Sequence, residues 1–253
     1  MIFVLDVGNT NIKCGLFENA KLLHSFRIST NVEATSDEYG IKLLSFFKNL
    51  HLTADEVTGI IISSVIPSVN YTLEHMALQY FDIKPLFVGP GIKTGINIKY
   101  DAPKDLGTDR IVNAVAAFEL FGGPCVTVDF GTATSFGAIS EDGEFLGGAI
   151  CPGIKIAAEA LTLNAAKLPR IELQMPETVV CRSTIAGMQA GILYGYVGQV
   201  EFIVNKMKSE MGEAKVIATG GLASIIAKKT NVIDEIVPTL TLIGLYKIYE
   251  KNM

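Results

Sequence analysis

The stretch Ile2-Phe3-Val4-Leu5-Asp6-Val7-Gly8-Asn9-Thr10-Asn11 places an aspartate, a glycine and several polar residues directly after an apolar run. The pattern returns in the middle of the 253-residue chain as Val126-Thr127-Val128-Asp129-Phe130-Gly131-Thr132-Ala133-Thr134. In both copies more apolar residues and a further glycine follow. A strand that ends in Asp-x-Gly predicts a hairpin whose backbone can approach a ligand closely. The repeat therefore indicates a duplicated nucleotide-binding unit.

The polar groups of the first copy suit a phosphate. Backbone N–H groups and the side chains of Asn9, Thr10, Asn11 and Lys13 could line an anion, as backbone nests do. A carboxylate beside a phosphate is repulsive alone, so Asp6 implies a cation between them, and Mg²⁺ prefers such an arrangement. The alternative for a single copy is an ordinary hairpin turn, in which Asp, Asn and Gly are common. The duplication favours the ligand site.

Composition limits the class of protein. Apolar residues make up 49% of the chain and 24 residues are glycine, which is typical of a globular fold. The net charge of −5 gives no electrostatic reason to expect nucleic acid as a partner. No apolar stretch is long enough to predict a membrane span, and the chain enters a strand pattern directly at its start. We expect a cytoplasmic protein with no membrane partner.

The cysteines do not predict a metal centre. They are widely separated and form no Cys-x-x-Cys pair, and they lie at Cys14, Cys125, Cys151 and Cys181. We interpret them as reduced thiols, and they suggest no zinc site.

The pattern of elements predicts an α/β chain with two similar halves. In the first half we expect strands at 2–8, 12–17, 21–29, 59–64 and 85–88, with helices at 36–50 and 69–80. A helix at 110–121 follows. In the second half we expect strands at 125–130, 134–140, 144–149 and 216–221, with helices at 153–164, 184–211 and 239–250. Both halves share the order three strands, helix, strand, helix. The predicted domains are residues 1–115 and 116–253.

The motifs resemble those of the acetate and sugar kinase, heat-shock ATPase and actin superfamily, and more narrowly those of the type III pantothenate kinases. The resemblance extends over essentially the whole chain. The matching pieces, in family order, are Asp6 to Lys13, Gly107-Thr108-Asp109-Arg110, Asp129 to Thr134, Gly147-Gly148 with Pro152-Gly153, and Thr219-Gly220-Gly221.

The resemblance implies two ribonuclease H-like domains with ATP in the cleft between them, and phosphorylation of pantothenate toward coenzyme A. It implies Asp129 as the ligand of K⁺ or NH₄⁺, although the residues alone do not distinguish K⁺ from Mg²⁺. Asp6 would hold Mg²⁺, directly or through water. The implied ATP-binding residues are Asp6, Val7, Gly8, Asn9, Thr10, Asn11, Ile12, Lys13, Thr132, Gly220 and Gly221.

Asp109 is the candidate catalytic base, because the resemblance matches it to a proton-accepting aspartate. From the residues alone, a helix N-cap is the alternative for Asp109, since an apolar helix follows it. Arg110 offers a planar fork for a carboxylate, and a structural salt bridge to Asp101 or Asp105 is its alternative. The resemblance makes Gly107, Thr108, Asp109 and Arg110 a substrate-contacting block with Tyr100 packed against it. A partly buried core aromatic is the alternative for Tyr100.

Thr184 stands before a long helix and is a natural N-cap or near-cap residue. Small residues recur along that helix at Ala186, Gly187, Ala190, Gly191, Gly195 and Gly198. This spacing allows close helix approach between subunits, and a buried core helix is the alternative. The family is dimeric, and its threonine matching Thr184 contacts substrate. We therefore expect a homodimer whose substrate site is completed across the interface.

Two other functions remain open. One is a kinase for another small hydroxy acid or a sugar. The other is an actin-like regulatory module that binds ATP. The length of 253 residues scarcely accommodates the insertions of filament-forming relatives, and no basic patch or DNA-binding motif is visible.

Overall fold

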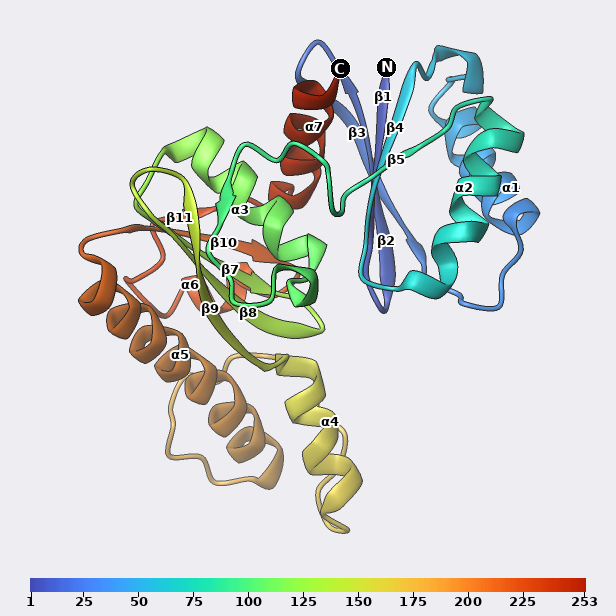
Figure 1. The fold of residues 1–253 in the computed structure, drawn as a ribbon. Helices are drawn as coiled ribbons and strands as arrows, with labels where there is room; N and C mark the ends of the chain where they lie inside the picture. The colour runs from blue at the N-terminus through green and yellow to red at the C-terminus, as the bar shows by residue number, and fades with distance from the viewer. The chain divides into compact units, whose positions relative to one another are not determined.

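The computed structural model describes all residues, 1–253, and divides into two units (Figure 1). Unit 1 comprises residues 1–95, 102–116 and 240–253, and unit 2 comprises residues 96–101 and 117–239. Each unit is built on one β-sheet. No helix in the chain combines the length and apolar character needed to cross a membrane.

The sheet of unit 1 is a meander extended by parallel strands. Its order is β3 (Lys21–Ser29), β2 (Asn11–Glu18), β1 (Ile2–Val7), β4 (Gly59–Ser64) and β5 (Leu86–Phe87). The first three strands pair antiparallel, and β4 pairs parallel to both β1 and β5. The central strand β1 is almost entirely buried, which explains its unbroken apolar run.

Helices cover both faces of this sheet. Helices α1 (Ser36–Asn49) and α2 (Pro67–Phe81) pack on the face that presents Phe3, Leu5 and Leu16, where they form one apolar core. Helix α7 (Leu240–Asn252) packs on the other face, where the ring of Tyr246 stacks on Phe17 at 4.6 Å between centroids. Because side chains alternate along a strand, Asp6 lies on the same face as α7.

The sheet of unit 2 repeats this plan. Its order is β11 (Glu235–Ile236), β10 (Lys215–Gly220), β7 (Cys125–Phe130), β8 (Ala133–Ile139), β9 (Glu144–Pro152) and β6 (Asn97–Ile98). Strands β9-β8-β7-β10-β11 correspond one by one to β3-β2-β1-β4-β5, with the same antiparallel and parallel pairings. The duplication predicted from the two Asp-x-Gly motifs is therefore present in the topology.

The core of unit 2 lies on the face that presents Val126, Val128 and Phe130. It is covered by α4 (Ile154–Asn164), α5 (Thr184–Met211) and α6 (Ala223–Ala227). Short 3₁₀ turns occur elsewhere in the chain at Ala54–Glu56 and Pro103–Asp105.

Two segments cross the boundary expected after residue 115. Strand β6 pairs with β9, so residues 96–101 belong to unit 2, and α7 packs on β1, so residues 240–253 belong to unit 1. Helix α3 (Thr108–Phe121) is divided between the units after Ala116. The second half also has two helices, α4 and α5, between its meander and β10, where the first half has one. These two helices were predicted from the sequence at 153–164 and 184–211, whereas the exchanged segments depend on long-range packing, which local patterns do not encode.

Candidate functional site

The first Asp-x-Gly motif forms a turn held by its own backbone. The N–H of Gly8 donates to the carbonyl of Asn11 at 3.1 Å, and the Thr30 hydroxyl donates to the carbonyl of Gly8 at 2.6 Å. Asn9, Thr10 and Asn11 are exposed at the tip. The turn is thus anchored while its polar groups face outward, which suits an anion.

Asp6 and Lys13 form an ion pair at the base of this turn. They are directly opposite in the β1–β2 ladder, and Lys13 Nζ lies 3.1 Å from Asp6 Oδ2. The Asp6 side chain is 8% exposed and that of Lys13 is 25% exposed. Lys13 Nζ also donates to Thr241 Oγ1 at 3.4 Å. A carboxylate and an ammonium group therefore lie together beside the exposed turn.

Helix α3 begins at the same edge of the sheet. The Ser63 hydroxyl donates to Thr108 Oγ1 at 2.9 Å, and Thr108 Oγ1 donates to the carbonyl of Ser64 at 3.1 Å. Ser63 is the parallel neighbour of Asp6 in the β1–β4 ladder. The start of α3 is thereby fixed at the carboxyl ends of β1 and β4, where polar groups of α/β proteins converge on ligands.

Asp109 lies in the first turn of α3. Its Oδ1 accepts a hydrogen bond from the N–H of Arg110 at 2.9 Å. Gly107 precedes the helix and accepts from the N–H groups of Arg110 and Ile111, so Asp109 is inside the helix and is not its N-cap. A side chain at Gly107 would meet Asp109 Oδ1. A carboxylate at this position also interacts favourably with the helix dipole. The neighbouring Arg110 is buried.

The second Asp-x-Gly motif has a matching arrangement in unit 2. Asp129 is the penultimate residue of β7 and is the parallel neighbour of Thr219 on β10. Gly220 has φ +95°, and a Cβ there would collide with Phe130 O and Asp129 Oδ1. Only glycine allows β10 to end so close to the Asp129 carboxylate. A Cβ at Gly221 would meet nothing within 4 Å, so that glycine borders open space.

The turn around Thr132 is closed by the start of α4. The N–H of Gly131 donates to the carbonyl of Ala133 at 3.0 Å, and both residues are exposed together with Thr132. A Cβ at Gly153 would strike the carbonyls of Gly131 and Thr132, so glycine is required there. The N–H groups at the start of α4 lie next to this turn, an arrangement that can bind anions.

The remaining predicted residues lie at other places in unit 2. The ring of Tyr100 packs on the buried ring of Phe145 at 6.3 Å between centroids. Thr184 is the exposed first residue of α5, and Ser183 is the N-cap, whose hydroxyl accepts from the N–H of Ala186. The role expected of Thr184 as a near-cap agrees with this position.

Asp6 and Asp129 each fit the expected cation only as one ligand among several oxygen atoms. Among residues 1–253 no group of three or more His, Cys, Asp or Glu side chains could hold a metal ion. In phosphoryl-transfer sites Mg²⁺ takes one or two carboxylates and completes its shell with phosphate oxygens and water, so Asp6 fits as a single ligand. Near Asp129, the hydroxyl of Thr219 is fully buried and makes no hydrogen bond, which supplies a second oxygen for a hard cation.

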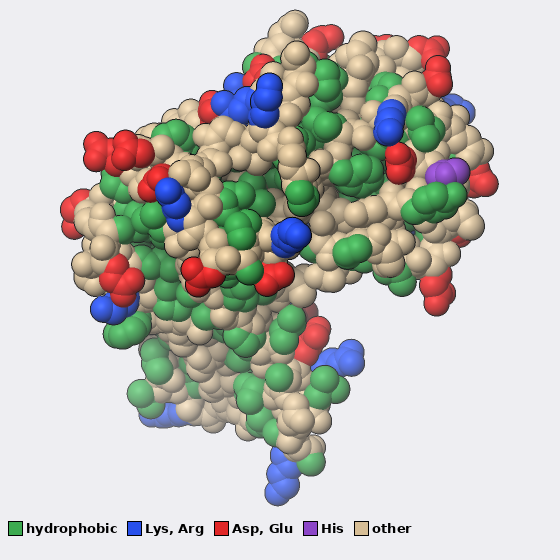
Figure 2. Space-filling model, in the orientation of Figure 1, with side chains coloured by type: hydrophobic (Ala, Val, Ile, Leu, Met, Phe, Trp, Pro, Cys, Tyr) green, Lys and Arg blue, Asp and Glu red, His purple; other side chains and the backbone are tan.

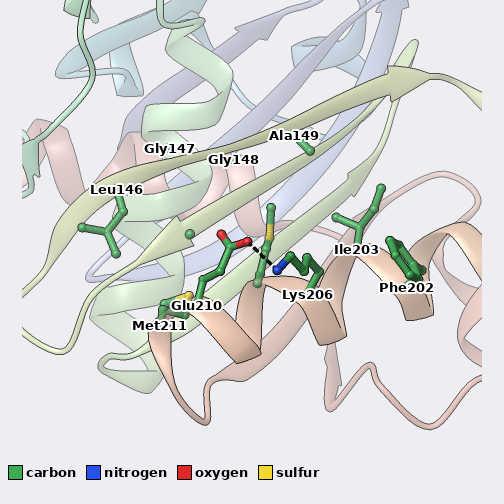
Figure 3. A pocket seen from close by; sticks show the side chains of 11 residues that line it. Leu146, Gly147, Gly148, Ala149, Phe202, Ile203, Lys206, Glu210 and Met211 are labelled. Carbon is green, nitrogen blue, oxygen red and sulfur yellow. Dashed lines mark ion pairs between the residues drawn. The ribbon is translucent and has the colours of Figure 1, made fainter.

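A cavity of about 420 Å³ lies elsewhere in unit 2, between β9 and the C-terminal half of α5 (Figure 3). Its walls are mainly apolar, and Lys206 and Glu210 form an ion pair of 3.4 Å beside it. It contains none of the predicted site residues.

Three residues at these sites were not predicted from the sequence to be functional. Ser63 anchors the start of α3, Thr241 contacts Lys13, and Gly153 closes the Thr132 turn. Gly153 belongs to the Pro152-Gly153 motif, for which the sequence alone predicts no role. Thr241 gives a weak signal, because it is a buried hydroxyl within an apolar segment.

Two sheets of the same strand order, each with an Asp-x-Gly turn after its first strand, define the duplicated ribonuclease H-like fold of actin-like ATPases and sugar kinases. Solved structures share this fold. A Baf family protein from Campylobacter jejuni is 18% identical with a TM-score of 0.63, over 99% of this chain and 98% of that one. The ethanolamine utilization protein EutJ from Carboxydothermus hydrogenoformans is 13% identical, with a TM-score of 0.56, over 97% and 89%. ROK hexokinase from Thermus thermophilus is 11% identical, with a TM-score of 0.54, over 98% of both chains. The predicted fold class is confirmed.

The family model of type III pantothenate kinases matches residues 2–206. The match covers most of the chain and includes both Asp-x-Gly motifs and the Gly107–Arg110 block. This chain therefore belongs to the type III pantothenate kinase family, and the resemblance stated from its motifs is confirmed.

Proposed function

We propose that this protein transfers the γ-phosphoryl group of ATP to the primary hydroxyl of pantothenate, giving 4′-phosphopantothenate and ADP. The observation that carries the proposal is the placement of Asp109. Hydrogen bonds from Ser63 and to Ser64 hold the start of its helix at the edge of the sheet that also bears the Asp6–Lys13 pair. The candidate proton acceptor and the candidate phosphate-binding turn are thus anchored to the same edge of one sheet, which supports the positioning that phosphoryl transfer requires.

Each chemical task of phosphoryl transfer has one or more candidate residues in this chain. Asp109 accepts the proton of the attacking hydroxyl. The turn from Asp6 to Lys13 binds phosphate oxygens, and Asp6 would hold Mg²⁺, which neutralises phosphate charge when bound. Thr132, Gly220 and Gly221 contribute to ATP binding from unit 2. Asp129 would hold K⁺ or NH₄⁺ together with the Thr219 hydroxyl. The pantothenate contacts are Tyr100, Gly107, Thr108, Arg110 and Thr184.

A homodimer is the second part of the proposal. One face of α5, here called the glycine face, consists of exposed residues spaced three or four apart, namely Thr184, Gly187, Gly191, Gly195, Gly198 and Phe202. A Cβ at each of the four glycines would meet no atom within 4 Å, and Phe202 is 74% exposed. Each helical glycine costs about 1 kcal/mol relative to alanine. Close packing against a second copy of this face would offset that cost.

Exposed hydrophobic residues of α4 and α5 also favour a second copy of the chain as the partner. Hydrophobic side chains reach the surface over α4 and α5, in the lower part of Figure 2. The exposed hydrophobic residues of α4, of α5 and of the segment between them include Ile156, Leu163, Val179, Val180 and Ile185. Exposed apolar surface of this extent is typical of an interaction site. We take a second copy of the chain as the partner, because Thr184 of the substrate site lies on this face.

Subunit complementation tests whether the substrate site is shared. Asp109→Asn and Thr184→Ala should each inactivate the homodimer. Co-refolding equal amounts should restore about a quarter of wild-type turnover, because half of the dimers are mixed and each mixed dimer has one intact shared site. Restoration to no more than the sum of the two single variants would mean that each subunit builds its site alone.

The main experiment is an assay of ADP release with pantothenate, ATP and Mg²⁺ in K⁺ and then in Na⁺. Turnover that requires both pantothenate and K⁺ is expected. No turnover in either salt, with ATP bound, would overturn pantothenate as the substrate. Because the ROK hexokinase of Thermus thermophilus shares the fold, the same assay is run with sugars and other hydroxy acids. A preference for one of these would identify a different kinase. ATP-dependent sedimentation as polymers would instead support the regulatory module.

A further inference from the structure

We propose that Thr241 of α7 is a positioning residue that holds the Lys13 ammonium group for the phosphates of ATP. The proposal rests on the proposed function in one respect, namely that Lys13 contacts phosphate. It adds a residue from the far end of the chain, in a segment that the family model does not match.

The contacts around Lys13 carry the argument. Its ammonium nitrogen lies 3.1 Å from Asp6 Oδ2 and 3.4 Å from Thr241 Oγ1. Thr241 is 2% exposed, whereas the Lys13 side chain is 25% exposed. The carboxylate and the buried hydroxyl therefore both hold the ammonium group, while the Lys13 side chain stays partly exposed to solvent.

Packing against strand β2 holds helix α7 in place near the Thr241 hydroxyl. A Cβ at Gly15 would come within 3.1 Å of Leu242, the residue after Thr241, so the glycine allows α7 to lie close to β2. Farther along the helix, the Tyr246 ring stacks on Phe17 of the same strand, and its hydroxyl accepts from the N–H of Ala20. The position of Thr241 Oγ1 relative to Lys13 is thus set by packing along the helix.

Lysine needs such support more than arginine does. Its charge sits on a flexible four-carbon chain, and ordering that chain costs conformational entropy. A pair with Asp6 alone would hold the ammonium from one side only. The second acceptor orders the lysine before ATP binds, so less entropy is lost on binding.

The test compares Thr241→Val with Thr241→Ser in the full-length protein. Valine keeps the shape of threonine and removes the acceptor, whereas serine keeps the acceptor and removes a methyl group. ATP affinity is measured from the rise in melting temperature with millimolar Mg²⁺-ATP. We expect Thr241→Val to weaken ATP binding by about tenfold or more, which is the effect of losing one hydrogen bond to a charged group. Thr241→Ser should bind ATP nearly as the wild type does.

If Thr241 only stabilised the fold, the two variants would show the opposite pattern. Serine would then be the more damaging change, because it leaves a small cavity in a buried site, and it would lower the melting temperature without ATP. Equal ATP affinity of wild type and Thr241→Val would overturn the proposal.

A double-mutant cycle shows whether Thr241 acts through Lys13. In a Lys13→Met background, Thr241→Val should cause no further loss of ATP affinity. Additive losses would overturn the positioning role.

The readout separates this proposal from the proposed function. ATP binding without pantothenate turnover would overturn the substrate and leave the Thr241 comparison valid. No ATP-dependent rise in melting temperature for the wild type would overturn both.

Discussion

Gly244 of α7 lies directly against the backbone carbonyl of Val112 in α3, and a Cβ at position 244 would overlap that oxygen. Both residues belong to unit 1, where α7 also contacts Lys13 through Thr241. The same α3 carries Asp109 in its first turn. Helix α7 therefore packs against both the helix that carries the candidate base and the strand that carries Lys13.

Gly244→Ala should destabilise the protein, because a backbone atom has little room to move away from the added methyl group. Overpacking of this kind costs about 1–3 kcal/mol in the free energy of unfolding, which urea titration measures. Gly89→Ala is the matched control, since a Cβ at Gly89 meets nothing within 4 Å. Equal stability of both variants would mean that α7 and α3 are less closely packed.

Asp109→Asn should retain ATP binding and lose most turnover. The amide cannot accept the hydroxyl proton, and loss of a positioned base typically lowers the rate by ~10²–10⁴-fold. The asparagine keeps the shape of the side chain beside the N–H of Arg110. Turnover is measured as ADP release, and ATP binding as a thermal shift. A wild-type rate in this variant would exclude Asp109 as the base.

Asp129→Ala should abolish the dependence of activity on K⁺. The change removes the carboxylate next to the buried Thr219 hydroxyl, and an oxygen ligand set without its charge binds a hard cation poorly. The rate is compared in K⁺ and Na⁺ at equal ionic strength. Unchanged activation by K⁺ would place the cation elsewhere.

Gly195→Leu should weaken the dimer by at least about tenfold, because a branched side chain on the glycine face keeps two helices apart. Sedimentation velocity at a series of concentrations measures the dissociation constant. Lys42→Leu on the exposed side of α1 adds the same apolar group in unit 1 and should leave association unchanged. If Gly195→Leu remains as dimeric as the wild type, the glycine face is not the interface.

Stability should fall in alkaline solution because of buried thiols. Burial raises the pKa of Cys125 from its ordinary value of 9.0 to about 12, and burial together with the charge of Asp6 raises that of Cys14. A pKa that is higher in the folded state gives full stability below pH 9 and a loss as pH rises from 9 toward 12. Urea unfolding across that range measures the slope. Cys125→Ala should reduce the slope, and an identical slope would contradict this origin.

Local sequence patterns determined much of this fold. The apolar run before Asp6 predicted β1, its repeat before Asp129 predicted β7, and the two together predicted a duplication that the strand orders contain. These predictions succeeded because strand periodicity, glycine turns and helix starts depend on neighbouring residues. The roles of individual residues in binding and catalysis stay predictions.

Only the tertiary structure decided how distant segments meet. Lys13 and Thr241 are 228 positions apart, and no local pattern links them. The same holds for the pairing of β6 with β9 and for Thr219 beside Asp129. By itself, then, the sequence determined the strands, the turns and the family motifs. Packing of α7 on β1 and β2 decided what surrounds the lysine, because such contacts depend on the shapes of surfaces that form only after the chain has folded.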